Sequence, residues 1–264
     1  MVVRKYFKIY LRFLSRNIQS SMEYKVDFLL GILANLFQSI LGLIFIWAIF
    51  NRIPTIKGWN FHEVAFVYGF AIIPSGISEL FLNNVWLIPT VYVNQGNLDR
   101  ILTKPLNPLF HIIADGFEPH GFGFIIFGAS LCVYSTLKLG LSFSFLNILY
   151  FMVMITSGTI IYFSINLFMA TLSFWLMDIV SSMVLVHHLS EFAKYPLIIY
   201  HKAVQIILTW VIPYAFTSFF PAIFLLKKGA LMLSFLTPAV AISVFLIAYS
   251  FWNFGLKRYQ SSGS

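Results

Sequence analysis

The sequence has little charge and almost no cysteine. Only 10% of its 264 residues are charged, whereas 59% are hydrophobic. Soluble domains carry about 25% charged residues, so this composition indicates an integral membrane protein. Cys132 is the only cysteine, which excludes an internal disulfide and argues against a metal site built from several thiolates. Neither a metal nor hydrolytic chemistry at an ordinary water-exposed site is expected.

The sequence also lacks a phosphate-binding loop. No G-x-x-x-x-G-K-[ST] stretch occurs, and no polar region is long enough to fold a nucleotide-binding domain. Any energy from ATP must therefore come from another chain. No cofactor is expected in this one, and it is not expected to be an enzyme.

Long apolar runs dominate the sequence instead. About 20 mostly apolar residues suffice for a helix to cross the hydrocarbon core. The expected spans are residues 26–50, 61–82, 121–137, 145–177, 180–200 and 231–253. A further run, residues 203–226, is interrupted by Pro213 and Pro221, which favours a re-entrant segment that packs against protein, sheltered from lipid. We therefore expect an all-α integral membrane protein with six transmembrane helices, in which residues 26–264 form a single domain.

Positive charge gathers before the first span. Six of the seventeen Lys and Arg residues lie there, and they are Arg4, Lys5, Lys8, Arg12, Arg16 and Lys25. The loop after that span, residues 51–60, has only Arg52 and Lys57. The positive-inside rule then places both ends of a six-span chain in the cytoplasm, in the inner or plasma membrane of the cell. The net charge of +8 is explained by this topology, so no nucleic-acid partner is expected.

Residues 1–25 are predicted to form an amphipathic helix on the membrane surface. Five basic residues recur at helical spacing, namely Arg4, Lys5, Lys8, Arg12 and Arg16, and apolar residues occupy the remaining arc. One interpretation is an anchor whose basic side chains bind anionic lipid. The other is a helix that also contacts a cytoplasmic partner.

Residues 83–115 are the longest other stretch expected in the cytoplasm, and they contain the pattern of a short helix. Asn97 can cap its start and Pro105 ends it. The expected apolar face has Leu98, Ile101 and Leu102, and the charged face has Asp99, Arg100 and Lys104. Such a helix can dock into a groove on another protein or lie at the lipid surface, and the pattern alone allows both.

Three stretches of the chain resemble ABC-2-type transporter permeases. The first is Gly96-x-Leu98-Asp99-x-x-Leu102-x-Lys104-Pro105-Leu106-Asn107-Pro108. The second is Tyr195-Pro196, followed by Ile212-Pro213 and Phe220-Pro221-Ala222, and the third is the ending from Trp252 through Gly255-Leu256-Lys257-Arg258-Tyr259 to Gly263. Their order and spacing, with the hydropathy, extend the resemblance over essentially the whole chain.

The resemblance implies an export pathway between two permease chains, identical or similar, above two separate ABC ATPase subunits that bind ATP and magnesium. In this family the short helix between the second and third spans is the coupling helix, which passes the closure of the ATPases to the membrane domain. The residues assigned to it by resemblance are Gly96, Leu98, Asp99, Arg100, Leu102, Lys104 and Pro105.

Ionisable residues in the spans are candidates for the pathway, because charges in a bilayer are costly. They are Glu79, Asp178, His187, His188 and Glu191. Glu79 and Asp178 lie near expected span ends, where water can solvate them, and both histidines can approach Glu191 on a helix. Two alternatives therefore stay open, a secondary transporter driven by an ion gradient and a membrane-embedded enzyme. The sequence does not identify the substrate.

Overall fold

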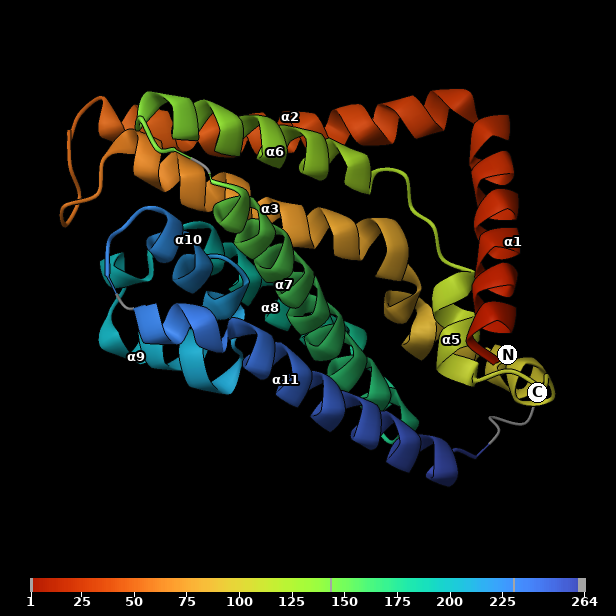
Figure 1. The fold of residues 1–264 in the computed structure, drawn as a ribbon. Coiled ribbons are helices and arrows are strands. Elements are labelled where there is room, and N and C mark those ends of the chain that lie inside the picture. Colours follow the sequence, from red (N-terminus) through yellow and green to blue (C-terminus); the bar gives the residue numbers. More distant parts are fainter. Residues whose placement is uncertain (1, 143, 230, 261–264) are drawn as a thin grey trace.

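The computed structural model describes residues 2–142, 144–229 and 231–260. Regular secondary structure within these ranges is helical throughout, without a strand (Figure 1). The last residues of the C-terminal sequence motif, Ser261 to Gly263, lie outside them. The expectation of an all-α membrane protein is confirmed.

Five helices in the described part of the chain are long and apolar enough to cross a membrane. They are α2 (Lys25–Phe50), α3 (Phe61–Leu82), α6 (Gly121–Lys138), α7 (Phe145–Thr171) and α11 (Leu231–Arg258). Their bounds agree with five of the six expected spans. Local sequence fixes the start of α3, since the Asn60 side chain accepts a hydrogen bond from the Glu63 backbone amide and the Glu63 carboxylate accepts one from the Asn60 backbone amide.

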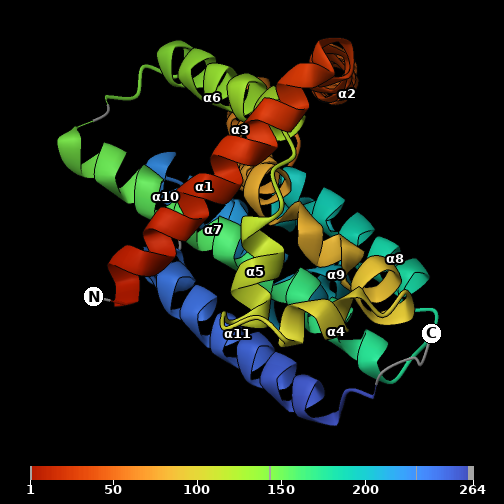
Figure 2. The ribbon, with the colours of Figure 1, turned by 90° about the vertical axis from the view of Figure 1, so that its right-hand side faces the viewer.

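The two ends of the bundle differ in what they carry. One end, here called the terminal end, holds α1 (Val2–Glu23), α4 (Asn97–Leu102), α5 (Pro108–Ala114) and the last turn of α11 (Figure 2). The opposite end, here called the far end, holds the loop of residues 51–60 (Figure 1). α1 turns sharply away from α2 and lies across the terminal end (Figure 1), as a helix on a membrane surface would.

The fifth expected span, residues 180–200, is not one continuous helix. α8 (Val180–Ser190) has 11 residues and is followed by the short 3-10 turns η4 (Glu191–Lys194) and η5 (Leu197–Ile199). Tyr195 is extended, with φ −126° and ψ 156°, because the ring of the following Pro196 disfavours helical backbone at the preceding residue. The segment still reaches the far end, where the Lys57 ammonium donates to the Ile198 carbonyl over 2.8 Å.

The run of residues 203–226 is a bent helical pair. α9 (Lys202–Ile206) continues as the π-helical turn η6 (Ile207–Val211), and η7 (Tyr214–Thr217) leads into α10 (Phe219–Leu225), with a 75° bend between the two arms. After the second arm, Lys228 donates to the Gly58 carbonyl over 2.6 Å. Both flanks of the pair thus contact the far-end loop, which is the geometry of a re-entrant segment.

The expectation that this segment is sheltered holds for one arm only. Tyr214 and Phe216 in the second arm are at most 1% exposed, whereas Trp210 in the first arm is 69% exposed. The first arm keeps its backbone hydrogen bonds inside helical turns, so lipid can cover it without leaving backbone groups unpaired. The backbone leaves the regular helical pattern at Pro213, and this residue is buried.

α3 and α6 pack with their backbones in direct contact. Gly69 lies opposite Gly128, and Gly76 lies opposite Gly121. A methyl group at position 128 would lie 2.7 Å from the Gly69 carbonyl oxygen, and one at position 121 would lie 2.5 Å from that of Gly76. Small residues allow this approach, which membrane helices use in place of a hydrophobic driving force.

Candidate functional site

α4 is the short helix that the sequence predicts between the second and third spans. Its start differs from the prediction, because Gly96 precedes it in a left-handed conformation (φ 71°) and Asn97 is its first residue. The Asn97 amide donates to the Val91 carbonyl over 3.0 Å, which ties the start of α4 to the preceding π-helical turn η2 (Ile88–Asn94). Glycine adopts this positive φ angle without strain because it has no Cβ atom.

α4 has one buried face and one exposed face, as a docking helix requires, but the prediction for Leu102 was wrong. Leu98 and Ile101 are 0% and 5% exposed, but Leu102 is 41% exposed and joins the outer face. A helix of six residues has only two positions that face the core, and the third apolar residue is left outside. Arg100, Lys104 and Pro105 are also exposed, so this face of the terminal end is basic and partly apolar.

The buried face of α4 belongs to the core that joins three membrane helices. Leu98 and Ile101 share one hydrophobic cluster, here called the terminal core, with residues of α7, α8 and α11. Those residues are Phe163, Leu167 and Ala170 of α7, Met183 of α8, and Ala248 and Trp252 of α11. α4 itself lies against η2 and α5, and this shared core connects it to the spans.

α5 joins α4 to the surface helix α1. The Phe110 ring of α5 meets Tyr6 of α1 edge-on at 4.7 Å, and the His111 ring meets Phe13 at 5.2 Å. Lys104 donates to His111 Nε2 over 3.0 Å. Burial, and secondarily the nearby Lys104 ammonium, lower the pKa of His111 below its usual value.

The end of α11 also reaches α4. Burial first, and then the Asp99 carboxylate, raise the pKa of Tyr259, which directly follows the last residue of the helix. The five basic residues of α1, Arg4, Lys5, Lys8, Arg12 and Arg16, are all exposed on the same end of the molecule. Because α1 contacts α5, it is attached to the segment that carries α4 as well as being free to meet lipid headgroups.

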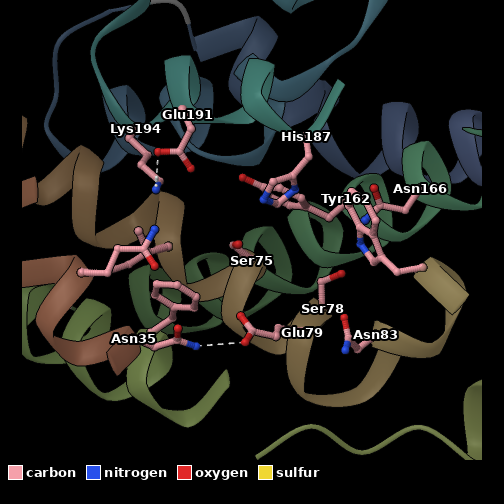
Figure 3. Close-up of a pocket in the computed structure, with 14 residues that line it drawn as sticks. Asn35, Ser75, Ser78, Glu79, Asn83, Tyr162, Asn166, His187, Glu191 and Lys194 are labelled. Atoms are coloured by element: carbon pink, nitrogen blue, oxygen red, sulfur yellow. Dashed lines mark hydrogen bonds and ion pairs between the residues drawn. The ribbon is translucent and has the colours of Figure 1, made fainter. Parts of the chain in front are cut away.

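A polar cavity of about 290 Å³ lies in the membrane domain and is lined by α2, α3, α6, α7 and α8 with the turns that follow α3 and α8. It brings together Glu79, His187 and Glu191, three of the five predicted pathway residues (Figure 3). The other two, Asp178 and His188, are exposed and do not line it.

The two carboxylates in the cavity have different partners. Glu191 pairs with the Lys194 ammonium at 2.7 Å, and neither histidine binds it. The Asn35 amide donates to Glu79 over 2.9 Å (Figure 3) and to the His120 carbonyl over 3.0 Å. Asn35 thereby holds α2 against α3 and the start of α6.

Sequence reasoning missed the uncharged part of this cavity. Asn35, Ser75, Ser78, Asn83, Tyr162 and Asn166 line it together with the charged groups. Asparagines within long apolar runs were a visible signal, because amide side chains are costly in lipid unless they meet polar partners. Their convergence depends on how the spans pack and could not be read from the runs themselves.

Residues 36–263 match the family model described as ABC-2 family transporter protein. The chain belongs to the ABC-2 transporter family. No curated protein and no solved structure gave a significant match. The match extends from within α2 to the C-terminal motif, so it includes α4 and every residue that lines the cavity of this ABC-2 permease except Asn35. The protein is therefore a multi-pass membrane component of a transporter.

Proposed function

We propose that this chain is the permease subunit of an ATP-driven exporter. It pairs with a second permease chain, itself or a similar one, and two separate ABC ATPase subunits bind the ATP and magnesium that this chain does not. The terminal end faces the cytoplasm, in the inner or plasma membrane, because the basic residues of α1 gather there.

One observation carries this proposal. α4 and the turn after it expose Arg100, Leu102 and Lys104, while Leu98 and Ile101 insert into the terminal core. A partner that pushes on the exposed face would move the membrane helices as well, because the packed side chains between them resist compression. This is the arrangement that transfer of force from a separate ATPase requires.

The terminal core continues into the polar cavity. Phe163 and Leu167 of α7 belong to the core, and their neighbours Tyr162 and Asn166 line the cavity. Met183 of α8 belongs to the core, and His187, one turn later, lines the cavity. Movement of α4 can therefore reach the cavity through α7 and α8 without a flexible connection.

Triple substitution of Arg100, Leu102 and Lys104 by alanine tests the coupling role. ATPase subunits that co-purify with the chain from its native host are reconstituted with it in lipid nanodiscs. Loss of the exposed face should lower ATP hydrolysis by about fivefold or more, because coupling free energies between sites are of that order. None of the three side chains is buried, so the triple change should lower the melting temperature only slightly, through loss of the hydrogen bond from Lys104 to His111.

The matched control replaces Arg52 and Lys227, exposed basic residues of the far end, by alanine. Equal ATP hydrolysis in wild type, control and triple variant would overturn the proposal, as would a chain that purifies with no ATPase.

An ion-gradient-driven carrier is the alternative that the cavity itself favours, because Glu79, His187 and Glu191 line it together. Proteoliposomes separate the two mechanisms. Transport that needs ATP and ignores a pH gradient supports the exporter, and transport that follows the gradient without ATP supports the carrier. Glu191→Gln should abolish transport only in the second case.

A further inference from the structure

The polar cavity between α2, α3, α7 and α8 contains side chains that have no partner. Ser78 and Asn166 are 8% and 7% exposed, and within the described residues their side chains form no hydrogen bond. His187 Nδ1 is buried and also unpaired. Polar groups in a membrane interior cost several kcal/mol when unsatisfied, so this cavity is built to hold water or a polar ligand.

The charge of the cavity is unbalanced. Glu191 is neutralised by Lys194, and His120 beside the cavity pairs with Glu118 at 3.1 Å. Glu79 receives one neutral amide bond, from Asn35, and no ion pair reaches it in the described residues. A bound cation would balance this carboxylate, because an unpaired charge in a membrane domain is costly.

Aromatic rings form part of the cavity wall. Trp86 and Tyr162 both line it, with the His187 ring set edge-on to Trp86 at 5.4 Å. Aromatic faces attract ammonium groups, and they do so more strongly where water is excluded. A wall of rings beside one carboxylate fits an organic ammonium ion better than a small inorganic ion, which would need a shell of oxygen ligands.

We propose that this cavity is a binding site for an organic cation that also carries hydrogen-bonding groups. Its ammonium group pairs with Glu79 against Trp86 and Tyr162, and its polar groups meet Ser78, Asn166 and His187. Identification of this ligand with the exported substrate rests on the proposed permease function. Binding itself requires neither ATP nor the ATPase subunits.

Calorimetric titration of the full chain in lipid nanodiscs tests the site directly. The probes are choline, phenyltrimethylammonium and tetraethylammonium, with 3,3-dimethylbutan-1-ol as the neutral isostere of choline and empty nanodiscs as the blank. At least one ammonium ion should bind, and choline should bind about tenfold or more tightly than its isostere, because only choline pairs with the carboxylate. Failure of all three ions to bind, or equal binding of choline and its isostere, would overturn the proposal.

Glu79→Gln keeps an oxygen for the Asn35 amide and removes the charge, so it should weaken ammonium binding by about tenfold or more. Asp178→Asn is the matched control, since it removes an exposed carboxylate outside the cavity and should leave binding unchanged. Equal affinity of the Glu79 variant and wild type would contradict the assignment. If the Glu79 variant does not fold, the comparison of choline with its neutral isostere on the wild-type chain still tests whether the site binds a cation.

The two proposals fail in different ways. Absent ammonium binding together with ATP hydrolysis that depends on α4 would reject the ligand and keep the permease. Ammonium binding together with ATP hydrolysis that ignores α4 would keep the site and reject the coupling role.

Discussion

Lys104 and His111 show how single residues hold the segment between the second and third spans together. The Lys104 ammonium donates to a histidine that is 6% exposed and that also packs on Phe13 of α1. This contact needs a neutral imidazole with a free Nε2 lone pair. One pair of side chains thus connects α4, α5 and the surface helix.

Acidification should weaken this region. The pKa of folded His111 lies below the usual 6.5, so the unfolded chain takes up the proton first as the pH falls. The part of the free energy of unfolding that depends on neutral His111 is therefore fully present above pH 6.5. It should fall as the pH drops from 6.5 to the folded pKa, by at most about 1.4 kcal/mol per pH unit. Melting curves in detergent between pH 7.5 and 5.5 measure the decline.

His111→Asn should flatten this part of the pH dependence, whereas His188→Asn, at an exposed histidine of α8, should leave it intact. A decline of the same size in the His111 variant would show that another group is responsible.

At the scale of elements, the sequence contains the signals that start two of the spanning helices. Asn60 and Glu63 cap α3, and the Ser144 hydroxyl accepts from the Asn147 amide at the start of α7. It was insufficient for residues 180–200, where length and hydropathy predict one span but Pro196 divides the path. It also misplaced the cap of α4, because a glycine with positive φ can replace a side-chain cap.

The contact between α3 and α6 depends on glycines that face each other. Gly128→Ala should lower the stability of the membrane domain by about 1–3 kcal/mol, because the new methyl group would strike the Gly69 carbonyl and force the helices apart. Thermal unfolding in nanodiscs measures the loss. Leu137→Ala, on the same helix at a side chain that is 76% exposed, should change stability far less. Equal effects of the two changes would exclude close helix packing at this site.

At the scale of the whole molecule, the re-entrant pair decides the topology. If residues 202–225 enter and leave at the far end, Lys202 and Lys227 lie on one side of the membrane with Arg52, and Thr103 lies on the other. Single cysteines at these four exposed positions, in a Cys132→Ser background, can be labelled with a membrane-impermeant maleimide. We expect positions 52, 202 and 227 to react from one side and position 103 from the other. Labelling of 202 and 227 from opposite sides would make the pair a complete span.

The sequence by itself determined membrane residence, the positions of five spans and the location of the short helix between the second and third. Each depends on hydropathy, helical period or punctuation by Gly, Asn and Pro, which are properties of neighbouring residues. Tertiary structure alone decided that Glu79 of α3 meets Asn35 of α2 and lines one cavity with His187 of α8, and that Leu102 of α4 lies outside the core. The physical reason is that a polar side chain becomes costly or useful only through what packs around it, and those neighbours come from helices far away in the chain.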